Sequence, residues 1–404
     1  MGTCRLFYPL DNNYVFTARF LTEVAIPAAD SQVRGSHITA RYTEFDGVKV
    51  LLYEPVRRGS EALPGFVFFH GGGYIVGSAK FHGHVTRKLA EELGAVVVAI
   101  DYRLAPEHVF PAAFEDSLTV TKFFLNHAHD YGVDPSRIVV GGDSAGGQVA
   151  ASIVQAVYDD PSLPNIKLQV LFYPWLQFID FNTPSYQYHD YTFSDSPRRL
   201  ITLFVSAYCL GRIDESFLDQ LMANMHTSSE LKQSNTYQEL LNHDTIFKML
   251  EKIPKYPKYS NVPVQPTSAA FSLAKYQAFY KPQSHFDASN DTLWEEVRGC
   301  LLDPRNAPLL RDNFRGLPKA FVVTGDYDSI RDDGIFYVHA LEKSGVEVTW
   351  RNYLGTWHDT KLFASTLFKT VDAPIVKPLA TDSMASPAKD STTMFNKKAE
   401  AEHR

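Results

Sequence analysis

A serine framed by small residues is the first feature of this sequence that could carry out covalent chemistry. Residues 142–146 read GDSAG and match the pattern G-x-S-x-G, in which small neighbours allow a nucleophilic serine to occupy a strained turn. The β-branched run 137–142 predicts a strand before it, and the apolar spacing of 148–158 predicts a helix after it. Ser144 is therefore the candidate nucleophile, and the alternative is an ordinary strand-to-helix turn.

A serine at neutral pH needs a histidine to take its proton and a carboxylate to orient that histidine. After this type of turn the expected chain order is serine, acid, histidine. The stretch 326–333 offers four acids after a predicted strand, and spacing alone does not separate Asp326 from Asp328. Of the three histidines that follow, His339 falls in a predicted helix and His403 in the C-terminal tail. His358, in a predicted loop 354–360 after the last strand, is the candidate base.

A glycine-rich loop upstream could stabilise the negative charge that develops during acyl transfer. The sequence HGGG at residues 70–73 follows a buried apolar run, and glycines leave backbone N–H groups unshielded. Preorganised N–H donors at the former carbonyl oxygen are worth about 3 kcal/mol each. We expect Gly71, Gly72 and the amide of Ala145 to form this oxyanion hole.

Composition excludes several other functions. The net charge of −7 and the lack of a basic stripe argue against nucleic acid as a partner. The longest apolar run, 200–210, is too short to span a membrane, and residues 1–21 lack the layout of a signal peptide. As given, the chain is expected to be soluble and cytoplasmic.

Metal and disulfide sites are also not expected. The histidines at 82, 84, 108, 127 and 129 have no metal-binding spacing, so we expect neither a metal nor another cofactor. The three cysteines, at positions 4, 209 and 300, are widely spaced and odd in number. They are predicted to be buried free thiols.

Strands and helices alternate along most of the chain, which predicts a parallel sheet covered on both faces. Before it, residues 37–53 form two alternating runs around Asp46-Gly47, a sequence typical of a type I′ hairpin. Helices are predicted over 85–93, 112–129, 216–225, 237–249 and 334–344, with Asp134-Pro135 as a turn.

The alternation stops for more than a hundred residues after the strand 168–174. We expect one hydrolytic domain over residues 1–370, with a cap formed by 1–35 and an insertion at about 177–300. Residues 371–404 are poor in large apolar side chains, which predicts a disordered tail.

Four motifs occur in register along the chain: HGGG at 70–73, DYRLAP at 101–106, GDSAGG at 142–147 and YDSIRDDG at 327–334. Together they resemble the hormone-sensitive-lipase-like branch of the α/β-hydrolases. Within that branch, the sequence is similar to the arylacetamide deacetylase and neutral cholesterol ester hydrolase group. The resemblance implies an α/β-hydrolase fold with a helical cap, and it selects Ser144, Asp328 rather than Asp326, and His358.

The sequence departs from that group in three places. Members usually carry an N-terminal membrane anchor and face the endoplasmic reticulum lumen, whereas no anchor is expected in the sequence as given. A longer, anchored form of this chain would be expected at the endoplasmic reticulum. The group's two disulfide cysteines correspond to Ile75 and Gly325 here, which implies that this disulfide is absent. The histidine loop reads Thr-Trp-His-Asp at 356–359, where the group has a small residue after the histidine.

Two functions follow from these residues. The first is a serine hydrolase that cleaves small apolar carboxylic esters, or aryl amides, through an acyl-enzyme. The second is a ligand-binding or adhesion protein on the same scaffold with impaired catalysis, which the altered His358 loop would favour.

Overall fold

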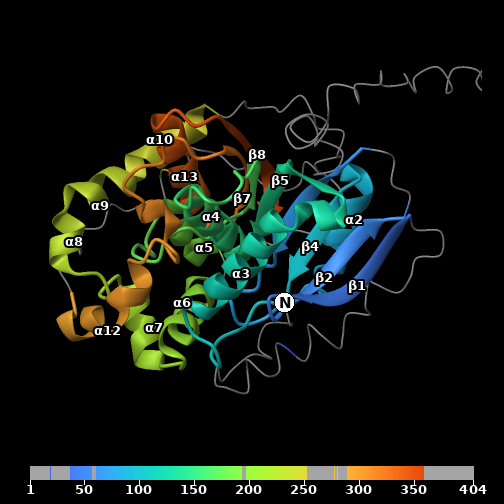
Figure 1. Ribbon diagram of the computed structural model, residues 1–404. Helices are drawn as coiled ribbons and strands as arrows, with labels where there is room; N and C mark the ends of the chain where they lie inside the picture. Colours follow the sequence, from blue (N-terminus) through green and yellow to red (C-terminus); the bar gives the residue numbers. More distant parts are fainter. Residues whose placement is uncertain are drawn as a thin grey trace, which may run out of the picture.

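The computed structural model describes residues 19, 37–56, 61–192, 197–252, 277, 280 and 289–358. Within them lies a sheet of eight strands in the order β1-β2-β4-β3-β5-β6-β7-β8 (Figure 1). The strands are β1 (Ile38–Phe45), β2 (Val48–Pro55), β3 (Leu63–Phe69), β4 (Val96–Ile100), β5 (Val133–Asp143), β6 (Leu168–Phe172), β7 (Lys319–Tyr327) and β8 (Val348–Trp357). The predicted α/β-hydrolase architecture is therefore confirmed.

The first two strands form the predicted hairpin at one edge of the sheet. Asp46 and Gly47 have φ angles of 47° and 83°, as a type I′ turn requires. β1 pairs with β2 and β2 with β4 in antiparallel fashion, and all remaining pairs are parallel. The carboxyl ends of the parallel strands consequently meet at one edge, where loops can bring distant residues together.

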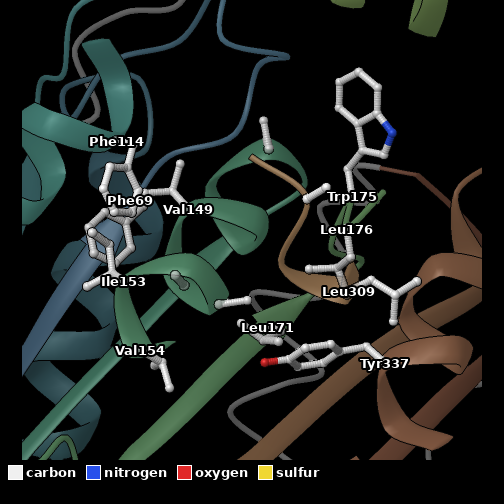
Figure 2. Packing of buried hydrophobic residues seen from close by; sticks show 14 of the residues in the cluster. Phe69, Phe114, Val149, Ile153, Val154, Leu171, Trp175, Leu176, Leu309 and Tyr337 are labelled. Atoms are coloured by element: carbon white, nitrogen blue, oxygen red, sulfur yellow. The ribbon is translucent and has the colours of Figure 1, made fainter. Parts of the chain in front are cut away.

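Helices cover both faces of the parallel part of the sheet. They are α2 (Gly83–Leu93), α3 (Ala112–Asn126), η2 (Ala128–Tyr131), α4 (Ala145–Tyr158), η3 (Pro308–Leu310) and α13 (Arg331–Lys343). Along β3, Phe66 and Phe68 pack into one apolar cluster, while Val67 and Phe69 pack into the other. This is the period of two expected for a strand that is buried on both faces. Figure 2 shows Phe69 beside Val149 of α4, the helix that follows the candidate nucleophile.

A group of helices is inserted between β6 and β7. Its described members are α5 (Pro184–Thr192), α6 (Pro197–Leu210), α7 (Glu215–Met222), α8 (Ser229–Gln233), α9 (Asn235–Leu240), α10 (His243–Glu251) and α12 (Asp291–Leu301). Figure 1 draws α6, α7, α8, α9 and α12 on the opposite side of the molecule from β1 and β2. No helix in the described part of the chain is long and apolar enough to cross a membrane.

Several predicted boundaries are wrong. The helix predicted over 112–129 ends at Asn126 and is followed by η2, and the helix predicted over 216–225 ends at Met222. The helix predicted over 237–249 is two helices, because the Asn242 side chain accepts a hydrogen bond from the Asp244 amide and begins α10. The turn predicted at Asp134-Pro135 lies within β5, which starts at Val133. The loop predicted from residue 354 begins only after Trp357, because β8 pairs with β7 as far as Tyr327 and Trp357. The predicted tail at 371–404, and residues 1–35 apart from Arg19, lie outside the described residues.

The prediction of free thiols is wrong for two of the three cysteines. Cys209 of α6 and Cys300 of α12 form a disulfide, with Cα atoms 5.7 Å apart and a separation of 91 residues. Because the insertion folds back on itself, two cysteines that are distant in sequence meet between neighbouring helices. The disulfide joins the second of the described inserted helices, α6, to the last, α12.

Removing this disulfide should destabilise the protein by about 2–4 kcal/mol, since it closes a long loop in the unfolded chain. We expect a Cys209→Ser/Cys300→Ser double variant to unfold at a lower denaturant concentration than the wild type. Reduction is the control, and it should lower the midpoint of the wild type while leaving that of the double variant unchanged. A thiol titration of the unfolded, unreduced protein should find one free thiol, whereas three would show that the disulfide does not form.

Candidate active site

The strand-to-helix turn at Ser144 has the strained backbone that its sequence predicts. β5 ends at Asp143, α4 begins at Ala145, and Ser144 between them has a φ of 55°. The Ser144 amide donates to the carbonyl of Phe172 on β6 at 2.9 Å, and its carbonyl accepts from the Trp175 amide at 3.2 Å. A positive φ is unfavourable for serine, so these contacts hold the turn in a conformation that lifts its side chain off the sheet.

The glycines on either side of Ser144 are required by packing. A Cβ on Gly142 would overlap the carbonyl oxygens of Gly146 and Phe69. A Cβ on Gly146 would likewise overlap the Phe69 carbonyl at the end of β3. Small residues therefore allow the turn to pack directly against the neighbouring strand, which brings Ser144 close to the glycine loop.

The structure brings Ser144, His358 and Asp328 together in one hydrogen-bonded chain. The Nε2 atom of His358 lies 2.9 Å from Ser144 Oγ, and its Nδ1 atom lies 3.0 Å from Asp328 Oδ2. Asp328 is 1% exposed, and its other carboxylate oxygen accepts from the Ile330 amide at 2.9 Å. The three residues follow β5, β7 and β8, so they come from the carboxyl ends of three parallel strands.

This geometry can activate a serine. With the Nδ1 proton donated to Asp328, the Nε2 lone pair of His358 is left to accept the Ser144 hydroxyl proton. The exposed fraction falls from 32% for the His358 side chain to 1% for that of Asp328. The carboxylate is thus shielded from water while the histidine remains accessible from outside.

One of the three backbone amides predicted to form the oxyanion hole, that of Gly71, is already hydrogen-bonded. The Gly71 amide donates to Asp143 Oδ1 at 2.9 Å, so it is not available to an oxyanion, contrary to our expectation. Among the described residues, the amides of Gly72, Gly73 and Ala145 have no hydrogen-bond acceptor. Gly72 and Gly73 have φ angles of 120° and 59°, which turn the loop, and Phe204 of α6 occupies the place of a Gly73 side chain. The amides available here are those of Gly72, Gly73 and Ala145.

A buried polar cluster lies beneath the glycine loop. His82 Nε2 lies 3.3 Å from the Asp143 carboxylate, and the His82 ring stacks on His70. Burial opposes the ionisation of Asp143, but His82 and the Gly71 amide outweigh it and keep the pKa of that carboxyl below its usual value. Burial, with His82 nearby, lowers the pKa of His70 to about 3, so His70 is neutral. Its Nδ1 atom lies 2.8 Å from the Gly71 carbonyl.

From the sequence, His82 was considered only as a metal ligand, which its spacing argued against, and Asp143 was assigned no role. The described residues contain no group of histidine, cysteine and acidic side chains suited to a metal ion. The sequence does show an acid, Asp143, directly before Ser144, and a glycine loop that begins with a histidine at 70–73. These two motifs do not show which backbone amide donates to the Asp143 carboxylate.

The loop that carries Asp328, and the helix α13 after it, are hydrogen-bonded to the segment that follows β6. The Ser185 hydroxyl donates to the Ser329 carbonyl at 2.7 Å. In the first turn of α13, Asp332 accepts from the Ser185 amide at 2.6 Å and Asp333 from the Leu176 amide at 3.0 Å. His189 of α5 is also buried nearby, and burial lowers its pKa to about 4 although Asp328 opposes this. At neutral pH His189 is therefore uncharged, and His358 is the histidine whose Nδ1 atom lies within hydrogen-bonding distance of Asp328.

Comparisons with known proteins agree with this arrangement. The family model of the alpha/beta hydrolase fold matches residues 66–238 and 256–362. Neutral cholesterol ester hydrolase 1 of Bos taurus is 36% identical over 331 residues, covering 80% of this chain and 74% of that protein. Arylacetamide deacetylase of Mus musculus is 36% identical over 337 residues, covering 81% of this chain and 76% of that protein.

Solved structures of esterases share the fold. A hyperthermophilic esterase from the archaeon Pyrobaculum calidifontis has a TM-score of 0.56 and 25% identity, and the match covers 90% of this chain and 91% of that one. A bacterial heroin esterase has a TM-score of 0.59 at 22% identity, covering 91% and 92% of the two chains. The resemblance noted in the sequence is confirmed: the chain belongs to the alpha/beta hydrolase fold family and is a relative of neutral cholesterol ester hydrolase 1 and arylacetamide deacetylase.

Proposed function

We propose that this protein is a serine hydrolase that cleaves carboxylic esters through an acyl-enzyme intermediate. The observation that carries the proposal is the hydrogen-bonded chain from Ser144 through His358 to the buried Asp328. The family, with relatives named as an ester hydrolase and a deacetylase, supports the same reaction class.

In the proposed mechanism, Ser144 Oγ attacks the ester carbonyl carbon while its proton passes to His358 Nε2. Asp328 keeps the imidazole in the required tautomer and stabilises the imidazolium that forms. His358 then donates the proton to the leaving alcohol, and the acyl group remains on Ser144. Water, deprotonated by His358, releases the acid in a second cycle of the same steps.

The negative oxygen of each tetrahedral intermediate would be bound by the amides of Gly72, Gly73 and Ala145. This assignment replaces Gly71 with Gly73, because the Gly71 amide is occupied by Asp143. Donors held by the fold do not need to reorganise during the reaction, so each is worth about 3 kcal/mol.

We further propose that the substrate has an apolar acyl or aryl group and that residues 1–35 and the insertion at about 177–300 form a cap over it. Phe204 of α6 lies against Gly73, which puts an aromatic side chain of the insertion next to the proposed donors. Arg19 from the N-terminal segment donates to the carbonyls of Ile75 and Ala105, beside the same loop. Aryl amides are a further substrate class, since one relative is named a deacetylase.

A fluorophosphonate probe tests the proposal directly, because it phosphonylates only a serine that is activated as a nucleophile. We expect stoichiometric labelling, with loss of p-nitrophenyl butyrate hydrolysis in proportion to the label. A catalytically impaired binding protein on the same scaffold would neither be labelled nor hydrolyse the ester, and that result would reject the proposed function.

A further inference from the structure

Tyr74, directly after the glycine loop, makes a buried hydrogen bond to the helix that follows Ser144. Its hydroxyl donates to Gln148 Oε1 at 2.7 Å, and neither residue is more than 1% exposed. Gln148 lies in the first turn of α4, four residues after Ser144. The bond therefore connects the glycine loop to the nucleophile's own segment of chain.

The Gln148 amide is held in one orientation. Its Nε2 atom donates to Ser152 Oγ at 2.8 Å and to the Arg305 carbonyl at 2.9 Å. Because both donor positions are used, Oε1 is directed toward Tyr74 and the amide cannot flip without losing these bonds.

The Tyr74 ring is held as firmly as its hydroxyl. It stacks on Tyr208 of α6 with ring centroids 3.8 Å apart and an angle of 6° between the rings. The Tyr74 carbonyl accepts from the Ala105 amide at 2.9 Å, and its backbone has a φ of 65°. Burial raises the pKa of Tyr74, and Tyr208 raises it further, so the hydroxyl stays protonated and remains a donor.

The residues before and after the proposed oxyanion donors are both hydrogen-bonded to the segment that contains Ser144. The Gly71 amide donates to Asp143, the residue before Ser144, and the Tyr74 hydroxyl donates to Gln148. Gly72 and Gly73 lie between the two attachments. Loss of either hydrogen bond would allow these amides to move relative to Ser144 Oγ. A shift of about 1 Å can lower the rate about a hundredfold.

We propose that Tyr74 and Gln148 are positioning residues that fix the Gly72 and Gly73 amides relative to Ser144 for ester hydrolysis. This inference rests on the proposed function. In this proposal neither side chain contacts the substrate. The Tyr74 hydroxyl should therefore stabilise the transition state without changing the affinity for the substrate.

Tyr74→Phe removes the hydroxyl and keeps the stacked ring. We expect kcat for p-nitrophenyl butyrate to fall about tenfold with KM within about twofold, because the loss is confined to the transition state. The inhibition constant of an alkyl boronic acid, whose tetrahedral adduct on Ser144 places an oxygen at the donors, should rise by the same factor.

Tyr337→Phe is the matched control. Tyr337 of α13 is also fully buried, and its hydroxyl donates to Oε1 of Gln169 on β6 at 3.0 Å. This variant loses the same type of bond and should keep the wild-type kcat and boronic acid inhibition. A kcat for Tyr74→Phe equal to the wild-type value, or an equal loss in Tyr337→Phe, would overturn the inference.

A second variant removes the acceptor instead. Gln148→Met should also lower kcat, and adding Tyr74→Phe to it should cause little further loss, because both changes break the same bond. Fully multiplicative losses in the double variant would reject the coupling. Where Tyr74→Phe cannot be purified, a wild-type kcat in Gln148→Met alone would overturn the inference. Wild-type enzyme that hydrolyses no ester would instead refute the proposed function, so the two failures are distinguishable.

Discussion

Ser144→Ala is expected to lower kcat/KM for p-nitrophenyl butyrate by about 10⁵- to 10⁶-fold, the largest effect of any single change. Without Oγ there is no atom to form the acyl-enzyme, and His358 loses the proton that it would accept at 2.9 Å. Slow hydrolysis by water bound near the glycine-loop donors should remain, since such donors retain part of the acceleration when the nucleophile is lost. Initial rates over a range of enzyme concentrations measure it, and the fluorophosphonate probe should no longer label the protein.

Ser117→Ala is a suitable control for this change. Ser117 is a fully buried serine on α3 and belongs to no part of the proposed mechanism. The Ser117→Ala variant should still be labelled by the probe and should hydrolyse the ester at the wild-type rate. If Ser144→Ala kept even a tenth of the wild-type rate, another residue would have to be the nucleophile.

Local sequence patterns predicted the elements that position this site. The type I′ hairpin at Asp46-Gly47 and the turn at Ser144 depend on backbone conformations that only a few residue types favour, so a short sequence suffices to predict them. The order of serine, acid and histidine was also readable, because parallel strands present their carboxyl ends at a common edge. The break before α10 had a readable signal too, since asparagine, found at position 242, is favourable immediately before the first residue of a helix.

The features that could not be predicted depend on contacts between distant segments. The Gly71 amide finds its acceptor 72 residues away at Asp143, and the disulfide joins cysteines 91 residues apart. A glycine run shows that amides are exposed locally, but it does not show what folds against them. The Tyr74 hydrogen bond to Gln148, 74 residues away, belongs to the same class. The choice between Asp326 and Asp328 depended on resemblance, because either carboxylate could follow this strand.

Asp328→Asn tests that choice and is expected to lower kcat by about 10⁴-fold. Asparagine keeps an oxygen that can accept from the Ile330 amide, but its NH₂ group would face His358 Nδ1. Nδ1 would then become an acceptor and the proton would move to Nε2, where it prevents His358 from accepting the Ser144 proton. The loss should appear in kcat, with KM nearly unchanged, in a steady-state assay of ester hydrolysis.

Asp326→Asn is the matched control, since Asp326 is two residues away and both carboxylates are 1% exposed. Each change replaces one buried carboxyl group at the end of β7 with an amide, so both variants should lose some stability. The hydrogen bond to His358 Nδ1 at 3.0 Å belongs to Asp328, and therefore only the Asp328 variant should lose activity by orders of magnitude. Equal losses in the two variants would mean that the loop acts through its total charge and not through one oriented carboxylate. A loss confined to Asp326→Asn would assign the role of the acid to Asp326.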